Sequence, residues 1–559
     1  MKIIFCMAVG MNSFSNSVQC RTCVVNKGAV CYNGLINFWE EATKMHSLKS
    51  LKHNIFFIVW LICMIPLTFG IEYFYGHVIC AGPNSLGEYF NIRRWFFFFC
   101  VLISVSLIVR FRDYLMKKIE VLFVILALSG GLIIIASLPA LSVISWDDET
   151  HYWRAINMSA AIGGYTQADL DFANHVYTNS FSLADINAIH QQLDAEAGNG
   201  IAQSGAFNLK SVFIYLAYIP VQIVMLILRL CDVPFHIAFV VGKIPILLTY
   251  VLLMYFAIKK LKSGKLILTV FALFPTMLFL AGNYSYDTWV TGWCALGIAY
   301  FIANMQTPEE KMPVKDMIIM IASFVIGFSA KAIYFPIMLL LLLLPSKKFS
   351  SSKVCRIFRC AVIVGMLILI ASFVLPMFQT SSVTTDIRGG SDVNGTQQMM
   401  YILSHPLAYA KTLLKFMIGY LSVERAADYT SFFAYLGYGH MTMFPVLLLG
   451  IATVLDRTPA DRYTSSWKVR IWSGILCFGT ACLAATSMYI AFTPVGAGYI
   501  NGCQPRYLLP LIFPLVYLTL GNSVKNEFSS KKSYYYFFCA AMTVVVFYTI
   551  WELIVCRYY

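Results

Sequence analysis

The chain has 559 residues, of which 59% are hydrophobic and only 12% are charged, and its formal net charge is +14. Soluble globular proteins carry about 25% charged residues, so this composition excludes an ordinary soluble domain and indicates an integral membrane protein. The excess Lys and Arg residues lie in short clusters between apolar runs. This pattern is typical of cytoplasmic loops and implies no nucleic-acid partner.

Residues 1–44 differ from the rest of the chain. The short apolar run at its start is followed by no clear small-residue cleavage site, so a signal peptide is not expected. Met45 leads through a basic stretch directly into the first long apolar run, which suggests that synthesis starts there. Residues 1–44 would then be an extension that is either untranslated or disordered.

Apolar runs near the roughly 20 residues that cross a bilayer recur from residue 54 onward. They predict an all-α bundle of about 13 transmembrane helices, at 54–71, 95–109, 120–141, 236–257, 266–284, 288–304, 317–330, 332–345, 360–378, 441–455, 469–491, 507–522 and 534–555. The run 211–230 is equally apolar, but a crossing there would move most of the later basic loops outside. We therefore assign it to a helix in the outer interface.

This topology places the N-terminus inside and the C-terminus outside, and it divides the chain into segments. Residues 45–141 carry the first three transmembrane helices, and 142–235 form an external loop with juxtamembrane helices. Central transmembrane helices occupy 236–378, a second external segment 379–440, and C-terminal transmembrane helices 441–559.

An acidic run opens the first external loop directly where a predicted span ends. It reads Asp147-Asp148-Glu149 and is followed by His151 and Arg154. Neighbouring carboxylates raise one another's pKa, which suits a general base. The alternative is a solvated loop that caps a helix, because acidic residues are favourable at helix N-termini.

Further charged residues lie at the outer ends of predicted spans, namely Lys243, Asp287, Lys331 and Arg506. Each alone is more often a snorkelling or structural residue than a ligand contact. Together with the acidic loop they gather cations and carboxylates on one membrane face, which suits a phosphate-bearing substrate and a base-activated partner. Lys331 and Arg506 are the expected phosphate contacts. Arg506 is suited to this role because its guanidinium fits two phosphate oxygens.

This pattern resembles that of a bacterial membrane family, domain of unknown function 2142, which is grouped with the glycosyltransferase C (GT-C) superfamily. The run Asp147-Asp148-x-x-His151-x-x-Arg154-Ala155 resembles the family signature Asp-Glu-x-x-His-x-x-Arg-Ala. Later segments match family motifs in the same order: Gly242-Lys243-Ile244-Pro245, Leu273-Phe274-Pro275 with Ser285-Tyr286-Asp287, Lys331-x-x-Tyr334-x-Pro336, and Thr493-Pro494-x-Gly496 with Gly502-Cys503-Gln504-Pro505-Arg506-Tyr507. The resemblance covers roughly residues 120–525. Asp148 replaces a Glu of the pattern, Lys243 an Arg, and Pro505 a Gly.

The resemblance implies a GT-C-like enzyme of the bacterial cytoplasmic membrane. Such enzymes transfer a sugar, with inversion, from a polyprenyl-phosphate carrier to a hydroxyl of a glycan or lipid acceptor on the outer face. Carried over, Asp147 is the base, Asp148 is the next candidate, and His151 supports it. Arg154, Lys243, Lys331 and Arg506 would contact the donor phosphate, and Glu149, Asp287, Tyr334, Gln504 and Tyr507 would complete the site.

Metal dependence is open at this point, because some GT-C relatives use a divalent cation and others do not. If this chain uses Mg²⁺ or Mn²⁺, Asp147 and Asp148 are the expected ligands.

Three other functions are compatible with the residues: a transporter or flippase for lipid-linked glycans, a glycan polymerase or ligase, and a non-catalytic partner in envelope assembly. Transporters often have internal repeats and charges near the bilayer midplane. Here the charges gather at the outer ends of spans and no repeat is apparent, which favours the transferase.

Overall fold

The structure is a computed structural model that describes residues 49–80, 83, 88–138, 151–156, 165–174, 183–196, 200–201, 215–379, 392–456, 466–519 and 531–559. The chain divides into two units, Met1–Cys63 and Met64–Tyr559, and the helical bundle belongs to the second. As expected for an all-α protein, the described residues are helical apart from loops and one antiparallel pairing of β1 (Tyr165–Thr166) with β2 (Gly200–Ile201).

Seven helical segments of the described chain are long and apolar enough to cross a membrane. They are Ile55–Ile79, Ile92–Arg110, Ile119–Ser137, Phe235–Lys260, Ser352–Ser372, Trp467–Phe492 and Ser533–Tyr558. A multi-pass membrane protein is therefore confirmed, whereas the count of about 13 crossings is not.

In chain order the described helices begin with α3 (Lys49–Phe74), η1 (Tyr75–Ile79), α4 (Ile92–Arg110), α5 (Arg112–Leu115) and α6 (Ile119–Ser137). The expected external loop carries a helical stretch at 151–156, then α8 (Gln167–Asn174), α9 (Leu183–Glu196), η3 (Leu216–Tyr218) and α11 (Ile219–Leu230). The central part consists of α12 (Phe235–Val241), α13 (Ile244–Lys260), α14 (Lys265–Ala272), α15 (Pro275–Ala281), α16 (Asp287–Met305), α17 (Val314–Ser329), η4 (Ala332–Leu343), η5 (Ser346–Lys348) and α18 (Ser352–Gln379).

The C-terminal part begins with a second group of short helices, α19 (Gly395–Ser404), α20 (Pro406–Tyr420), η7 (Val423–Arg425), α21 (Ala426–Thr430) and η8 (Ala434–Leu436). It ends with α22 (Phe444–Leu455), α23 (Trp467–Phe492), η9 (Pro505–Leu508), α24 (Leu509–Pro514), η10 (Leu515–Thr519), α25 (Lys531–Ile550), η11 (Trp551–Val555) and α26 (Cys556–Tyr558).

Several expected spans are short or irregular helices. The window 266–284 is split into α14 and α15, with Pro275 at the first position of the second helix. The window 332–345 is the 3₁₀ helix η4, and 507–522 is divided among η9, α24 and η10. Proline lacks the backbone N–H that a continuous helix needs, which accounts for the breaks in these runs, whereas α3 continues through Pro66.

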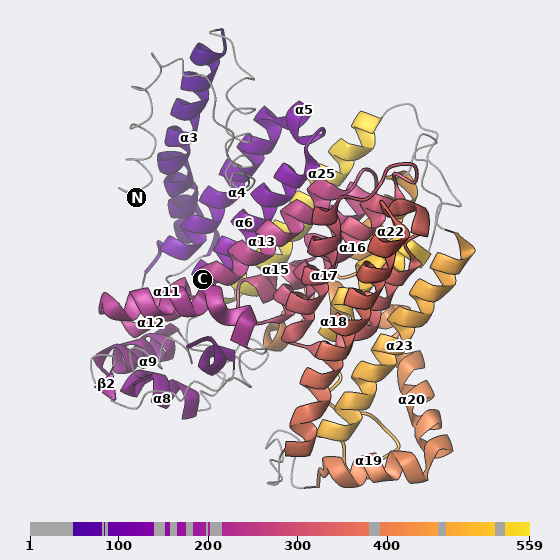
Figure 1. Ribbon diagram of the computed structural model, residues 1–559. Coiled ribbons are helices and arrows are strands. Elements are labelled where there is room, and N and C mark those ends of the chain that lie inside the picture. The colour runs from indigo at the N-terminus through magenta and orange to yellow at the C-terminus, as the bar shows by residue number, and fades with distance from the viewer. Residues whose placement is uncertain are drawn as a thin grey trace, which may run out of the picture. The chain divides into compact units, whose positions relative to one another are not determined.

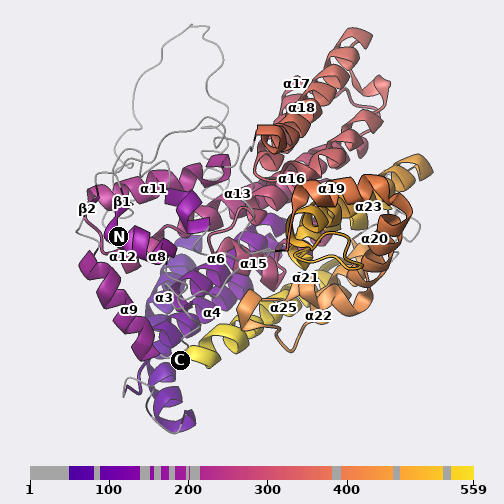
Figure 2. The same cartoon turned by 90° about the horizontal axis from the view of Figure 1, so that it is seen from below.

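Helices α16, α17 and α18 lie side by side, and α13 packs on α16 (Figures 1 and 2). Small residues allow the close approach, because a Cβ at Gly327 of α17 would lie 2.4 Å from Cβ of Trp293 on α16. Glycine at a helix interface is the usual way for membrane helices to pack tightly. The hairpins at the ends of these helices are thereby held in fixed positions.

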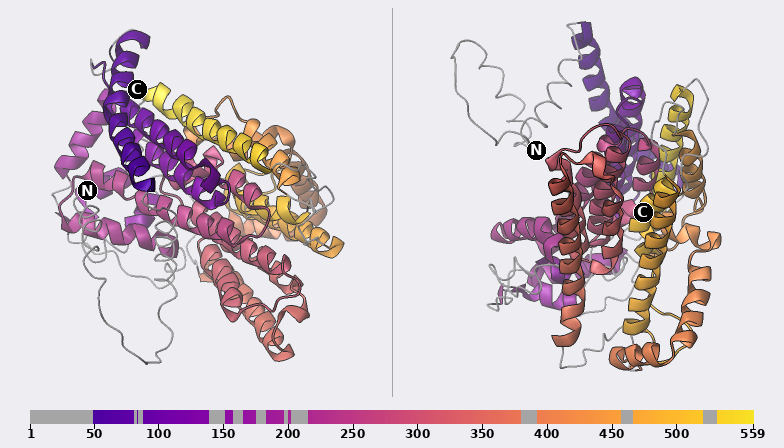
Figure 3. Two further views of the ribbon diagram at one scale, coloured as in Figure 1. Left: turned by 90° about the horizontal axis from the view of Figure 1, so that it is seen from above. Right: turned by 45° about the vertical axis from the view of Figure 1, so that its right-hand side comes forward.

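The described parts of the expected external loop form a second apolar core. It joins 151–156, α8 and α9 to α11, α12 and the turn before α16 through the buried residues Tyr152, Phe172, Leu193, Met225, Phe239 and Tyr284. Figure 1 shows α11 lying across the direction of α18 and α23, and the placement of this helix in the membrane interface stays a prediction. Helices α19 and α20, within the expected external segment 379–440, pack against α23 (Figure 3).

Candidate functional site

Asp287 lies at the centre of a buried group of charges. It is the first residue of α16, and its backbone N–H donates to Oγ of Ser285 at 3.1 Å. One carboxylate oxygen lies 3.4 Å from Nζ of Lys331, and the other lies 3.2 Å from Nη1 of Arg506. Three helix ends that are far apart in the sequence therefore bring one carboxylate and two cationic side chains together.

Lys331 occupies the break between α17 and η4, where its extended backbone ends one helix before the next begins. Its ammonium lies 3.3 Å from the ring centroid of Tyr507 and 5.7 Å from that of Tyr286. Aromatic faces attract cations, so the two rings hold the side chain in addition to Asp287.

The backbone around Arg506 is fixed by a tight turn and two tyrosines. Gly502 has a φ of +75°, which L side chains rarely adopt, and a Cβ there would lie 2.9 Å from Phe492. The hydroxyl of Tyr420 donates to the carbonyl of Gln504 at 2.7 Å, and that of Tyr334 donates to the carbonyl of Tyr507 at 2.7 Å.

Pro505 is the first residue of η9, a position that suits its fixed φ and its missing N–H. The Pro at this position, where the resembled motif has Gly, is therefore compatible with the local backbone. It starts the helical turn that directs the guanidinium of Arg506 towards Asp287.

His151 brings the external loop to the same group. Its side chain is buried, its Nδ1 forms a hydrogen bond with the hydroxyl of Tyr218, and its ring lies 5.0 Å from that of Tyr286. Burial lowers the pKa of His151 well below its usual value, and the nearby charges of Arg154, Arg506 and Lys331 lower it further. The imidazole is therefore neutral at pH 7.

The same surroundings shift the pKa values of the ion group. Burial raises the pKa of Asp287, but Lys331 and Arg506 outweigh it and hold that pKa below its usual value. Burial lowers the pKa of Lys331 to about 8, although the charge of Asp287 opposes the shift. Near neutral pH the group thus contains one carboxylate and two cations.

Lys243 belongs to the neighbouring turn. Its Nζ donates to Oδ1 of Asn283 at 3.2 Å and lies 4.9 Å from the ring centroid of Phe239. Asn283 is four residues before Asp287, so the α15–α16 turn connects Lys243 to the ion group.

Gln504 offers a buried acceptor beside Arg506. Its Oε1 is buried and has no hydrogen-bond partner among the described residues. A buried carbonyl oxygen without a donor costs free energy, so a ligand hydroxyl that donates to it would be favoured.

The structure also identifies residues that the sequence analysis missed. Asp169 of α8 accepts from the hydroxyl of Tyr152 at 2.7 Å and pairs with Arg229 of α11 at 2.8 Å. This network ties the helical stretch 151–156 to α11. Neither Asp169 nor Arg229 lies in a recognisable motif, so no sequence signal could have selected them.

The proposed base lies outside this geometry. Asp147, Asp148 and Glu149 fall outside the described residues, so the roles assigned to them stay predictions. The carbonyl of Arg154 accepts from Nε2 of Gln222 at 3.3 Å. Within the described chain, no group of three or more His, Cys, Asp or Glu side chains could hold a metal ion.

The apolar helices and the charged group at their ends define a polytopic membrane protein with one candidate polar site. A family model for domain of unknown function 2142, described as a predicted membrane protein, matches residues 128–516. The chain therefore belongs to this family, and the matched region contains His151, Asp287, Lys331 and Arg506. A search of curated proteins and a search of solved structures found no match.

Proposed function

We propose that this chain is an integral membrane glycosyltransferase. It transfers a sugar from a polyprenyl-phosphate donor to a hydroxyl of a cell-envelope glycan or lipid on the outer face of the bacterial plasma membrane. The observation that carries the proposal is the meeting of Lys331 and Arg506, from separate helix ends, at one buried carboxylate beside His151. Buried cations that converge in this way are suited to a phosphate group.

In the proposed step, the acceptor oxygen attacks the anomeric carbon from the face opposite the phosphate. Its proton passes to Asp147, or to Asp148, and the bond between the anomeric carbon and the phosphate oxygen breaks with its electron pair on that oxygen. The configuration at the anomeric carbon inverts. Lys331 and Arg506 stabilise the charge that develops on the leaving polyprenyl phosphate, which is an electrostatic contribution to the transition state.

Asp287 holds both cations in position before the donor arrives. When the phosphate binds, it shares these cations with Asp287, so the ligand meets groups that are already oriented and loses little free energy in ordering them. The neutral imidazole of His151 accepts or donates a hydrogen bond without adding charge. Lys243 and Arg154, which belong to the resembled sequence motifs, add positive charge around the ion group.

The lipid tail would leave the site between α11 and the bundle. A small crevice lined by Pro220 of α11, Pro245 and Thr249 of α13, and Thr288 of α16 runs along this boundary. Its volume of about 10 Å³ would hold no more than one water molecule. Entry of a polyprenyl chain therefore requires α11 to move, a motion that the proposal includes.

The proposed topology is GT-C-like, with the N-terminus inside and the acidic loop outside. It counts short and irregular helices such as α14–α15 and η4 as crossings in addition to the seven long segments, which gives about 13. Reaction of single introduced cysteines in 142–235 with an impermeant reagent on intact cells would test the orientation. Labelling only after lysis would contradict it.

The direct test is a transfer assay with purified full-length protein and a panel of polyprenyl-phosphate sugars. Asp147→Asn or Asp148→Asn should lower turnover at least about tenfold, which corresponds to about 1.4 kcal/mol of barrier. Glu424→Gln, at an exposed carboxylate of the second expected external segment, is the matched control and should retain full turnover.

Three results would redirect the proposal. Normal turnover in both Asp variants would remove the base assignment. Use of lipid-linked oligosaccharides but not monosaccharides would indicate a polymerase or ligase, and movement of the lipid across vesicles without transfer would indicate a flippase.

A further inference from the structure

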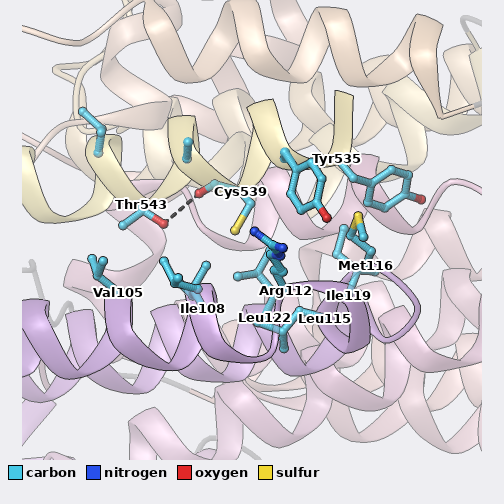
Figure 4. Close-up of a pocket in the computed structure, with 14 residues that line it drawn as sticks. Val105, Ile108, Arg112, Leu115, Met116, Ile119, Leu122, Tyr535, Cys539 and Thr543 are labelled. Carbon is cyan, nitrogen blue, oxygen red and sulfur yellow. Dashed lines mark hydrogen bonds between the residues drawn. The ribbon is translucent and has the colours of Figure 1, made fainter. Parts of the chain in front are cut away.

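A second cavity lies away from the charged site, between the first helices and the last. One wall is formed by α4, α5 and the start of α6, and the other by α25 (Figure 4). Its volume is about 350 Å³, within the range of about 300–1,000 Å³ that is usual for small-ligand sites. It shares no lining residue with the group around Asp287.

The wall of this groove is almost entirely apolar. Val105 and Ile108 of α4 lie opposite Thr543 of α25, whose hydroxyl donates to the carbonyl of Cys539 at 2.7 Å (Figure 4), and Val544 also lines the groove. That hydroxyl is satisfied by its own helix, so the surface offered to an occupant consists of hydrocarbon. A chain of methylene groups fits this part of the groove.

The opposite end of the groove adds one cation and two phenol groups to the apolar side chains of Leu115, Met116 and Ile119. Arg112, Tyr535 and Tyr536 line it, and the guanidinium of Arg112 points towards α25 (Figure 4). Arg112 lies 3.9 Å from Asp113, and both side chains are about two-thirds exposed, so this contact leaves the guanidinium accessible. The hydroxyl of Tyr536 donates to Asp113 at 3.3 Å.

The chain around this end carries an excess of positive charge. The stretch from Arg110 to Lys118 contains four cations, Arg110, Arg112, Lys117 and Lys118, and one acid, Asp113. The N-terminal end of α25, which lies at the same end of the groove as Tyr535, adds the positive pole of a helix dipole. A negative group is therefore favoured at this end of the groove.

The groove is reached from the side that faces lipid. Val109 on α4 and Val544 on α25 are 62% and 51% exposed, and both helices lie in membrane-spanning segments. Apolar side chains exposed on a membrane span face acyl chains, so the occupant arrives from the bilayer.

We propose that this groove binds an anionic glycerophospholipid, with part of an acyl chain between α4 and α25 and the phosphate at Arg112. By the distribution of basic residues, this end of the groove lies in the cytoplasmic leaflet, where basic residues beside membrane helices bind acidic headgroups. Binding would clamp the N-terminal helices to α25. The inference does not depend on the proposed transferase activity.

The test is native mass spectrometry of the full-length protein after delipidation. Phosphatidylglycerol and phosphatidylcholine with identical acyl chains are added separately, and the dissociation constant is read from the bound fraction. One cation near a headgroup makes about a fivefold difference in affinity, so phosphatidylglycerol should bind at least that much more tightly than phosphatidylcholine. Arg112→Gln should remove this preference and leave phosphatidylcholine binding unchanged.

Two further variants separate the headgroup from the groove. Ala540 lines the groove and is exposed, so Ala540→Phe should weaken binding of both lipids without disturbing the core. Lys315→Gln removes an exposed charge of α17, away from the groove, and should change neither. Equal affinity for the two lipids, an unchanged preference in Arg112→Gln, or retention of polyprenyl phosphate but of neither glycerophospholipid would each overturn the assignment.

Discussion

Replacing Asp287 with Asn tests whether the buried cations are arranged for an anion. The amide preserves the shape of the side chain but removes the charge that lies 3.4 Å from Lys331 and 3.2 Å from Arg506. All three side chains are at most 14% exposed, so solvent screens the interaction little. Removing one partner of a buried ion pair costs about 3–5 kcal/mol, because the remaining charge stays buried.

The expected shift in thermal stability follows from the size of the chain. With about 2.1 cal/mol/K of unfolding entropy per residue, the 559 residues give about 1.2 kcal/mol/K. A loss of about 3–5 kcal/mol then lowers Tm by about 2.5–4 °C. Tryptophan fluorescence of the purified protein on heating measures this shift.

The informative comparison is the response to ligand. Polyprenyl phosphate should raise the Tm of Asp287→Asn more than that of the wild type, since its phosphate replaces the missing negative charge. The matched control is Asp316→Asn, which breaks a pair with Lys260 at 2.7 Å elsewhere in the bundle. That variant should lose stability and recover none of it with polyprenyl phosphate. An unchanged Tm in Asp287→Asn, or equal recovery in both variants, would refute the reasoning.

Three further predictions concern the groups around this site. Burial lowers the pKa of Lys331 to about 8, so the ammonium loses its charge as the pH rises through that value. The KM for the donor should therefore rise above about pH 8, and Lys331→Arg should move this rise beyond about pH 10. A lysine with a lowered folded-state pKa contributes to stability in the opposite direction, increasing it as pH rises from 8 to 10.5, so unfolding at Lys331 would not explain the rise in KM. Arg229→Ala should leave Asp169 buried without its cation and speed hydrogen exchange in α8, and unchanged exchange would show that the pair does not anchor that helix. Tyr334→Phe removes the hydrogen bond to the carbonyl of Tyr507, worth about 1 kcal/mol, and should raise the KM for the donor about fivefold; a change in kcat alone would count against this positioning role.

The regular part of the fold could be predicted from hydropathy. The windows 120–141 and 534–555 correspond closely to α6 and to the helices from α25 to α26. A window average fails where an apolar run is not one straight helix. It does not register that Pro275 separates α14 from α15, or that 332–343 adopts a 3₁₀ helix. Those features depend on backbone hydrogen bonding, which hydropathy does not encode.

The candidate site was predictable in its residue types but not in its contacts. Order along the chain placed Asp287, Lys331 and Arg506 at the expected outer ends of separate spans, and the structure brings these three together. The sequence assigned Lys243 to the same phosphate, and that role stays a prediction; in the structure its ammonium donates to the side chain of Asn283. Tyr218, the partner of His151, lies in a run that reads only as apolar.

The irregular helices and the charged residues occur at the same places. Asp287 follows the broken pair α14–α15, Lys331 separates α17 from a 3₁₀ helix, and Arg506 lies in another 3₁₀ turn. In a bilayer, non-helical backbone is tolerated where protein or a polar cavity satisfies its hydrogen bonds, as the hydroxyls of Tyr334 and Tyr420 do around Arg506. Each break costs helical hydrogen bonds, yet it turns a side chain away from the lipid face and into the bundle. Three such breaks converge on one carboxylate. The proposed ligand site accounts for this convergence, whereas unrelated packing requirements at three helix ends would not.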